Sequence, residues 1–359
     1  MQVALVSVEV SKLGGVERYA HCIANLLRPV VFTNRTDGII SARHIPSIGR
    51  PDLLRKEIFP ILSTVLCRRS GFDIVHSMGV SHLSPHCVTA HTSGRYMLRL
   101  LERGELFFHL SPLRKLYWRA RLFVPAALER WMYRKNIPIV PVSNLLRNVL
   151  GSDYGIPGKR ITVIYPGVDT EEFKPSAEMR ERTRERLGLR GEVVLFVGGQ
   201  DKRKGLHFLV EALRGLDVTL LICGGEHRDM PAVYNACDIL VLPSLFDSFG
   251  FPVLEAMASG IPVIVSKNTG ASELVDGTAA GLVLEDPRDI GDIRRKIVSL
   301  LGDKERLYDM GNEARQIALR YNLSHFRDSL LKFYESLFTE TAQRNSTAGS
   351  SDPFEGKDV

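Results

Sequence analysis

Two carboxylates, Asp247 and Glu255, stand with seven residues between them in the stretch LPSLFDSFGFPVLEAMASG, where Gly250 and Phe251 open a short helix after an apolar strand. The first amides of a helix lack intrahelical partners and lie at the positive end of its dipole, so such a junction binds phosphate. Carboxylates would repel a bare phosphate, and we therefore expect them to accept hydrogen bonds from hydroxyl groups. The pattern predicts a site for a nucleotide that carries a sugar. The alternative is an ordinary strand–helix–strand unit with incidental carboxylates.

Two further glycine loops follow apolar strands. In FVGGQDKRKG, Arg203 and Lys204 stand before a helix, where cations and backbone amides can hold a diphosphate. This is not a Walker loop, because G-x-x-x-x-G-K-[ST] is absent, and surface cations at a turn are the alternative. Gly14 and Gly15 follow the first apolar strand and allow a phosphate or sugar to approach the backbone closely. Close packing of the next helix would explain these two glycines equally well.

His91 ends the apolar strand of VTAHTSG, and the carboxyl end of a parallel strand lies on the ligand face of a sheet. A histidine satisfied within the core is the alternative. The sequence contains no D-x-D and no His/Cys cluster with ligand spacing, so we expect no metal. Five scattered cysteines without a C-x-x-C pair predict reduced thiols in a cytosolic compartment. They are Cys22, Cys67, Cys87, Cys223 and Cys237.

These motifs resemble the retaining GT-B glycosyltransferases of family 4. The resemblance rests on FGFPVLEAMASGIPV, GASELVDG, VPVSNLLRNVL and RITVIYPGVDTEEF, and FVGGQDKRKG is similar to the bacterial lipopolysaccharide-core glucosyltransferases. It spans nearly residues 1–335, with its specific motifs concentrated in the second half. The family usually has Glu at the first carboxylate, where this chain has Asp247. The resemblance implies an α/β fold, GT-B, in which two Rossmann-like domains with parallel sheets face a central cleft.

The resemblance also implies roles for the residues above. Arg203 and Lys204, with the amides of Gly250 and Phe251, would hold the donor diphosphate. Glu255 would bind the ribose hydroxyls.

Four more residues take implied roles around the donor. Gly14 and Gly15 would face the donor diphosphate from across the cleft. Asp247 and His91 would orient the transferred sugar, and Asp247 is the residue to test as a nucleophile or ion-pair stabiliser. We expect Asp247, His91 and Glu255 to be the catalytic residues.

We predict the domain organisation from the length of the chain and from the proline and glycine residues at the junction. A chain of 359 residues can form two domains, and Pro166 and Gly167 indicate the junction. We expect an acceptor-side domain over 1–166, a donor-binding domain over 167–322, a helix over 323–340 that crosses back to the first domain, and a disordered tail over 341–359. MQVALVSVEV is expected to be a strand rather than a signal peptide. The segment after Cys223 is shorter than in the family, which leaves the nucleobase open.

Residues 94–135 interleave arginines and lysines with aromatic side chains, including both tryptophans, in a chain of net charge +6. Such a segment is typical of an interfacial helix on an anionic membrane surface. A packed helix pair with solvated arginines is the alternative. Nucleic acid is not expected, because no nucleic-acid-binding motif accompanies the charge. No apolar run is long enough to span a bilayer.

The sequence hypothesis is therefore a retaining, metal-independent hexosyltransferase that needs no cofactor. It would use a nucleotide-sugar donor, a UDP-sugar before others, and a glycan or lipid-linked acceptor in cell-envelope polysaccharide or lipopolysaccharide synthesis. We expect a cytoplasmic protein, peripheral on the inner face of the membrane. Two alternatives stay open: a nucleotide-sugar epimerase on the same scaffold, and a catalytically inactive module that binds a membrane surface.

Overall fold

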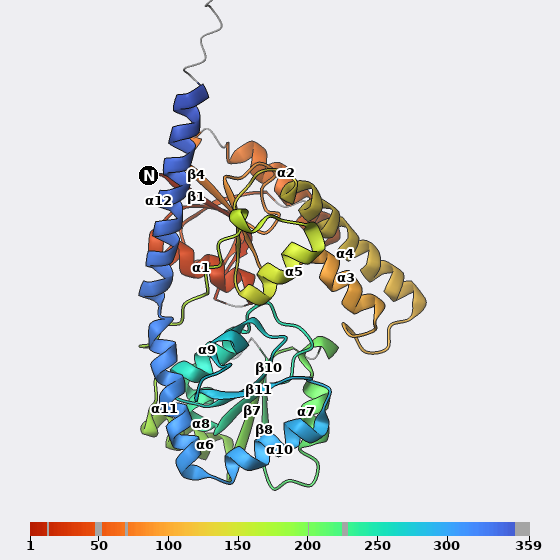
Figure 1. Ribbon diagram of the computed structural model, residues 1–359, viewed down its shortest axis with the longest axis vertical. Helices are drawn as coiled ribbons and strands as arrows, with labels where there is room; N and C mark the ends of the chain where they lie inside the picture. The colour runs from red at the N-terminus through yellow and green to blue at the C-terminus, as the bar shows by residue number, and fades with distance from the viewer. Residues whose placement is uncertain (13, 47–51, 69–70, 200, 225–228, 349–359) are drawn as a thin grey trace, which may run out of the picture.

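The structure is a computed structural model that describes residues 1–12, 14–46, 52–68, 71–199, 201–224 and 229–348. Two α/β domains lie one above the other, with helix α11 (Lys304–Arg320) along the side of the second domain and helix α12 (Leu323–Ala348) along the side of the first (Figure 1). Each domain is built on a parallel sheet. The expected fold class, two Rossmann-like domains with parallel sheets, is confirmed.

The first domain contains a six-stranded sheet in the order β3-β2-β1-β4-β5-β6, and all its pairs are parallel. The central strand β1 is the apolar run VALVSVEV, and β4 and β5 are buried along their whole length. Continuous burial of this kind is typical of parallel strands covered on both faces. The strands are β1 Val3–Val10, β2 Val30–Thr36, β3 Ala42–His44, β4 Ile74–Met78, β5 Cys87–Ala90 and β6 Ile139–Pro141.

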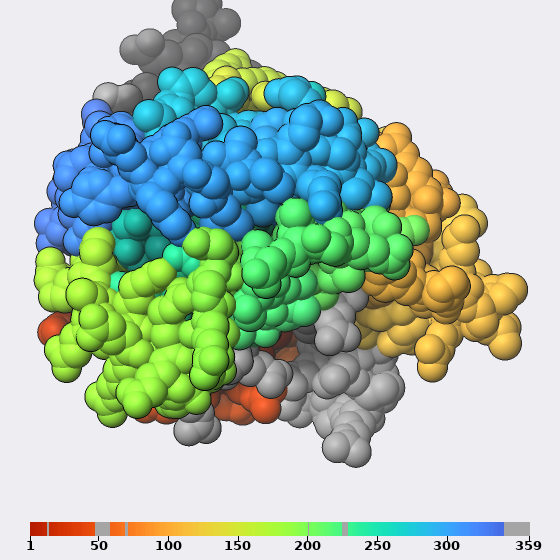
Figure 2. Space-filling view, turned by 90° about the horizontal axis from the view of Figure 1, so that it is seen from below, coloured from red at the N-terminus to blue at the C-terminus, as the bar shows by residue number. Residues whose placement is uncertain are grey.

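The helices of the first domain are α1 Val16–Leu27, α2 Asp52–Leu66, α3 Gly94–Glu102, α4 Pro112–Tyr133 and α5 Asn144–Tyr154. Ser93, Ser111 and Ser143 cap the last three by accepting hydrogen bonds from amides of the first turn. Helices α3 and α4 pack on each other and extend sideways from the body (Figure 1). From the second-domain end, the same orange and yellow segment projects beyond the rest of the surface (Figure 2).

The second domain contains a five-stranded parallel sheet in the order β11-β10-β9-β7-β8. Its strands are β7 Val193–Val197, β8 Thr219–Cys223, β9 Ile239–Leu242, β10 Val263–Ser266 and β11 Gly281–Leu284. Its α-helices are α6 Ala177–Leu187, α7 Leu206–Ala212, α8 Met230–Ala236, α9 Phe251–Ala258, α10 Ile290–Leu301 and α11 Lys304–Arg320, with short 3-10 turns η3 Lys202–Lys204 and η4 Gly270–Leu274. The neighbours of β7 are β8 and β9, so the strand order reverses beside β7.

The chain passes between the domains twice, at two points that lie side by side. Val168 donates its amide hydrogen to the carbonyl oxygen of Tyr321 at 3.0 Å, and it forms an isolated parallel bridge with Asn322. A Cβ on Gly167 would stand 2.8 Å from the Asn322 carbonyl oxygen, so the close approach of the two segments requires glycine there.

The last helix, α12 Leu323–Ala348, returns to the first domain and packs on α1. Its Tyr334 hydroxyl lies 2.6 Å from Nδ1 of buried His76 on β4. Burial lowers the pKa of His76 to about 3, so the ring is neutral. The expectation of a disordered tail from residue 341 is wrong for residues 341–348, because α12 continues through them. Residues 349–359 lie outside the described residues.

Candidate functional site

The predicted site residues lie at the carboxyl ends of strands. In an open parallel sheet, ligands bind outside these ends, where the strand order reverses. In the second domain the reversal lies between β7 and β9. Lys204 follows β7 and Asp247 follows β9, so the fold places both of them at this point. In the first domain Gly14 and Gly15 follow β1, and His91 follows β5.

Asp247 and Lys204 form an ion pair. The distance from Lys204 Nζ to Asp247 Oδ2 is 2.5 Å, and the side chains are only 17% and 13% exposed. The Asp247 amide donates to the Asn268 carbonyl oxygen at 2.9 Å, which fixes the loop. Burial opposes ionisation of Asp247, but Lys204 and Arg203 outweigh it and hold its pKa below the ordinary value. The site therefore contains a charged carboxylate that already has a cation beside it.

Hydrogen bonds from neighbouring residues fix the orientation of the Arg203 guanidinium. Its Nη1 donates to the Phe246 carbonyl oxygen at 2.7 Å, and its Nη2 lies 3.3 Å from a carboxylate oxygen of Asp201. Its buried Nε has no hydrogen-bond partner among the described residues. The loop lies close against β9, since a Cβ on Gly205 would stand 1.9 Å from the Pro243 carbonyl oxygen. Arg203 and Lys204, which we predicted for the diphosphate, thus lie in one cluster with Asp247, which we predicted for the sugar.

Glu255 is not free. Its buried carboxylate accepts a hydrogen bond from the Tyr234 hydroxyl at 2.7 Å and forms an ion pair with Arg18 of α1, in the other domain. The Arg18 guanidinium lies 5.6 Å from the ring centre of Phe173 and 5.7 Å from that of Phe251. Burial opposes the charge on Arg18, but Glu255 outweighs it and raises the pKa. Arg18 is thus paired with the carboxylate of Glu255, which we predicted to bind the ribose hydroxyls.

The glycines predicted for the site differ in their backbone conformation. Gly14 and Gly250 have φ of 84° and 87°, which favours glycine strongly. Gly15 has φ −91°, and apart from its chain neighbours no atom of the described residues lies within 4 Å of a Cβ built on it. Close packing therefore does not explain Gly15, and the space beside it is open. Phe251 is the first residue of α9 and packs against Phe249.

The N-termini of the helices that begin at the cleft differ from the others. Helices α1, α7 and α9 have glycine at the N-cap position (Gly15, Gly205 and Gly250), and none of the three has a side-chain cap. Elsewhere, seven described helices have Ser or Asp caps that accept hydrogen bonds from their first amides. These helices are α3, α4, α5, α6, α8, α10 and α11. The first amides of α1 and α9 are thus left for a ligand, as anion binding requires.

His91 lies at the end of β5 with its ring edge-on to Tyr19 at a centroid distance of 4.8 Å. Its Nε2 is buried without a partner among the described residues. Burial lowers its pKa to about 3, so the ring is neutral. The ring contact of His91 is made within the first domain, whereas Asp247 and Glu255 belong to the second.

Glu273 joins the domains at a point that sequence reasoning did not assign a role. Its carboxylate accepts hydrogen bonds from the amides of Asn144 at 3.0 Å and Leu145 at 2.6 Å, at the N-terminus of α5, and from the Tyr165 hydroxyl at 2.5 Å. Beside it, the Ser143 hydroxyl donates to the Ser248 carbonyl oxygen at 2.6 Å. These contacts hold the loop that carries Asp247. The only signal in the sequence was the motif GASELVDG, which supported the resemblance without a function.

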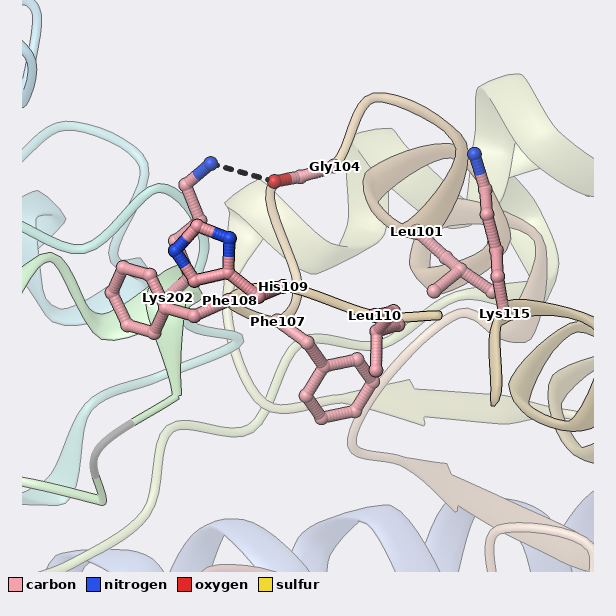
Figure 3. A pocket seen from close by; sticks show the side chains of 8 residues that line it. All are labelled: Leu101, Gly104, Phe107, Phe108, His109, Leu110, Lys115 and Lys202. Atoms are coloured by element: carbon pink, nitrogen blue, oxygen red, sulfur yellow. Dashed lines mark hydrogen bonds between the residues drawn. The ribbon is translucent and has the colours of Figure 1, made fainter. Parts of the chain in front are cut away.

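A pocket of about 260 Å³ lies where the α3–α4 loop meets η3 (Figure 3). Lys202 Nζ donates to the Gly104 carbonyl oxygen at 2.8 Å and joins the two domains there. Aromatic and aliphatic side chains line the pocket together with two lysines. The lining residues are Leu101, Gly104, Phe107, Phe108, His109, Leu110, Lys115 and Lys202.

Metal ligands and membrane spans also bear on the sequence hypothesis. In the part of the chain that the structure describes, no group of three or more His, Cys, Asp or Glu side chains could hold a metal ion. Within the same residues, no helix has the length and apolarity that crossing a membrane would need.

Comparisons with known proteins support the family resemblance. A family model described as "Glycosyltransferase Family 4" matches residues 13–172, and one described as "Glycosyl transferases group 1" matches residues 195–317. A D-inositol 3-phosphate glycosyltransferase of Corynebacterium kroppenstedtii is 28% identical over 223 residues, which are 51% of this chain and 49% of the relative. The enzyme of the same name from Corynebacterium urealyticum is 30% identical over 223 residues, 50% of this chain and 52% of the relative. The chain thus spans about half the length of the curated relatives it matches.

Solved structures share the fold over most of the chain. WaaG, described as a glycosyltransferase involved in lipopolysaccharide biosynthesis, has a TM-score of 0.77 at 17% identity and covers 92% of this chain and 99% of its own. Anabaena Alr3699/HepE, solved in complex with UDP and glucose, has a TM-score of 0.69 at 18% identity and covers 94% of this chain and 100% of its own.

Proposed function

Because this chain belongs to the GT-B glycosyltransferases of family 4, we propose that it transfers a hexose from a nucleotide-diphosphate sugar to a glycan or glycolipid, with retention of anomeric configuration. The observation that carries the proposal is the buried Asp247–Lys204 pair at the reversal point of the second sheet. Arg203 lies beside it in the same loop. This cluster has the charges that a leaving diphosphate needs.

The diphosphate would bind between Lys204, Arg203 and the uncapped amides at the start of α9. Before binding, Lys204 is paired with Asp247, so the donor would share a cation that the site has already positioned. Preorganised charge that meets developing negative charge commonly contributes more to an enzyme's rate enhancement than any other single effect. As the bond between the sugar and the diphosphate breaks, these groups would stabilise the leaving oxygen. The chain's own cations then suffice, and we propose that no metal is required.

Asp247 and His91 would act on the sugar. The ionised Asp247 carboxylate would accept a sugar hydroxyl or stabilise the positive charge that builds at the anomeric carbon. The neutral His91 ring has an unpartnered Nε2, which would hydrogen-bond to the sugar from the first domain. The acceptor oxygen would bond to the anomeric carbon on the face that the diphosphate leaves, and the acceptor proton would pass to the departing phosphate oxygen.

The nucleoside would bind at Glu255 through the ribose hydroxyls. Because Glu255 is paired with Arg18, the ribose must displace a guanidinium from the other domain. A uridine donor is supported by the HepE structures solved with UDP, with UDP and glucose, and with UDP-glucose. Residues 225–228, where the chain is shorter than its family, lie outside the described residues, so the nucleobase is a matter for the experiment below.

The acceptor proposal rests on the projecting helix α4. Leu113, Leu116 and Phe123 are 80%, 64% and 62% exposed, and α4 also carries Lys115 and Arg119. An exposed apolar and basic helix favours an anionic membrane surface. The pocket of Figure 3 lies at the end of the α3–α4 pair, next to the second domain, and combines an apolar lining with two lysines. This supports a lipid-linked acceptor, cell-envelope glycan synthesis, and a peripheral position on the cytoplasmic face of the membrane.

The test is a thermal-shift panel of UDP-, GDP- and ADP-glucose in the presence of EDTA. The proteins are wild type, Lys204→Ala and Lys267→Ala, where Lys267 forms an exposed ion pair with Glu285 outside the proposed site. A donor at a hundred times its dissociation constant stabilises the folded state by about 2.7 kcal/mol. We expect one nucleotide sugar to raise the melting temperature of wild type and Lys267→Ala but not of Lys204→Ala.

Two results would reject this site assignment. One is the absence of a shift with any nucleotide sugar, which would favour the inactive membrane-binding module. The other is an equal shift in Lys204→Ala. Product analysis then separates the reactions, because an epimerase would convert the donor without an acceptor.

A further inference from the structure

A second pocket, of about 590 Å³, lies at the amino-terminal edge of the first sheet. It is bordered by Val3 and Val30, the first residues of β1 and β2, so it is at the opposite end of the strands from the cleft. In Figure 1 the N marker identifies this end, at the side of the first domain remote from the second. None of the donor-binding residues proposed above lines this pocket.

Three arginines line the pocket: Arg28, Arg43 and Arg68. Within the described residues, none of the three is within 4 Å of a carboxylate oxygen. The acid at this edge, Asp73, instead accepts the amide hydrogen of Gln2 at 2.6 Å. All three arginines are exposed, so water solvates their charges in the absence of a ligand. The pocket is therefore a basic hollow at the surface, where an anion would find three cations and no described carboxylate paired with them.

Arg28 is held in an unfavourable backbone conformation. It ends α1 with φ 47° and ψ 48°, the left-handed region, and its amide donates to the Ala24 carbonyl oxygen at 3.1 Å. Helices α5 and α6 end in the same region with Gly155 and Gly188, where glycine avoids the steric cost. An arginine at this position costs folding free energy that glycine would not. Strain of this kind points to a role for the side chain.

Arg43 is fixed by stacking. Its guanidinium lies 5.5 Å from the ring centre of Phe32, which packs edge-on against Phe72 of the pocket wall at 5.8 Å. Leu27 and Leu66 line the same cavity. One guanidinium is therefore positioned by a helix end and another by an aromatic ring, beside an apolar wall.

We propose that this pocket binds a phosphate group carried on a molecule with an apolar part. Guanidinium groups match phosphate oxygens in charge and in their forked geometry. The phosphate would bridge Arg28, Arg43 and Arg68, and the apolar part would contact Leu27, Leu66 and Phe72. The headgroup of an anionic phospholipid and a soluble phosphorylated metabolite share this chemistry. The site is independent of the donor cleft, so the proposed transferase reaction does not depend on it.

The first experiment is a thermal-shift titration with inorganic pyrophosphate. Pyrophosphate also fits the donor cleft, so the proteins are Lys204→Ala, Lys204→Ala with Arg28→Gly, and Lys204→Ala with Arg320→Gln as a control at an exposed arginine of α11. We expect a shift in the first and third proteins and its loss in the second. Without ligand, Arg28→Gly should raise the melting temperature by roughly 2 °C, because glycine adopts the left-handed region freely.

The two measurements separate binding from structure. If Arg28 merely supports the fold, Arg28→Gly will lower the melting temperature of the ligand-free protein, and the proposal is wrong. The proposal also fails if pyrophosphate shifts all three proteins equally, or shifts none of them while vesicles give no difference. Arg68→Gln in place of Arg28→Gly must reproduce the lost shift, since it changes no strained backbone.

The source of the phosphate is then separated by sedimentation with vesicles. Vesicles of phosphatidylcholine with a phosphatidylglycerol fraction are compared with pure phosphatidylcholine, using wild type and Arg28→Gly. Weaker sedimentation of Arg28→Gly with the anionic vesicles alone assigns the site to a lipid headgroup. Equal sedimentation of the two proteins, together with a pyrophosphate shift that needs Arg28, assigns it to a soluble phosphorylated molecule.

Discussion

Arg18 and Glu255 come from different domains and form one ion pair in the ligand-free protein, in which the Glu255 carboxylate is buried and Arg18 is partly exposed. The sequence predicted Glu255 as a site residue but could not predict its partner, because 237 residues separate the two. The prediction of Lys204 and Asp247, in contrast, did not require knowledge of a contact between distant segments. Each could be recognised from its own loop, since both stand at a junction between a strand and a helix. Residue types and local spacing thus predicted candidate groups for a ligand site, but not how these groups pair without a ligand.

Replacing Arg18 by Gln tests whether the pair competes with the donor. Loss of one partner leaves the buried Glu255 carboxylate without its cation, so we expect the free energy of unfolding to fall by about 3 kcal/mol. Ribose hydroxyls would no longer have to displace Arg18. UDP should therefore bind roughly tenfold more tightly, a gain of about 1.4 kcal/mol. Calorimetric titration and thermal unfolding measure the two effects.

The matched control is Arg99→Gln, because Arg99 forms an ion pair with Asp153 inside the first domain at 2.5 Å. It should lose stability without a change in UDP affinity. Weaker UDP binding by Arg18→Gln would contradict the competition and would mean that Arg18 itself binds the donor.

The elements at the cleft were predictable in type and position, because glycine loops after apolar strands are local features. The strand–loop–helix units at β1, β7 and β9 are all present. Among the features that the sequence did not predict are β3 and the end of α12. β3 has only three residues, Ala42–His44, and none of its side chains is buried, so it has no apolar pattern. Residues 341–348 are mostly polar, yet they continue α12, which begins just after the bridge between Val168 and Asn322 and follows the first domain.

A substitution at Gly15 tests whether the start of α1 contacts the donor diphosphate. It begins α1 without a side-chain cap, and in the described part of the chain a Cβ there would meet no atom other than those of its chain neighbours. In the substitution Gly15→Ala, φ of −91° is acceptable to alanine, so the melting temperature should stay the same or rise slightly. The new methyl group would enter the space proposed for the donor diphosphate. We expect the affinity for the nucleotide sugar to fall roughly tenfold, about 1.4 kcal/mol, by calorimetric titration.

Gly151→Ala on α5 is the matched control, since its Cβ also meets no protein atom within 4 Å. It should leave donor affinity unchanged. If Gly15→Ala binds the donor as wild type does, the glycine serves only the turn, and the first domain does not contact the diphosphate there.

For the whole molecule, the sequence indicated two domains and the segment that joins them, but not the contacts that hold them closed. Those contacts depend on the relative placement of domains, which no local pattern encodes. Arg18–Glu255, Lys202–Gly104 and Glu273 with the start of α5 all join the two domains. These three contacts are polar, and polar contacts between domains permit relative motion. Closure of the cleft would exclude water from the proposed transfer.

Glu273 tests this closure, because it is the acceptor for several donors of the first domain at once. In Glu273→Gln, one carboxylate oxygen becomes an amide that faces the donors Leu145 N–H, Asn144 N–H and the Tyr165 hydroxyl. Loss of hydrogen bonds to a charged acceptor costs about 1.5–3 kcal/mol. We expect a larger radius of gyration by small-angle scattering and a higher KM for the nucleotide sugar, with kcat at saturating donor much less affected. Glu285→Gln, at a 78% exposed carboxylate paired with Lys267, should change neither quantity. If Glu273→Gln is as compact as wild type with the same KM, Glu273 only caps α5, and closure must depend on Arg18 and Lys202.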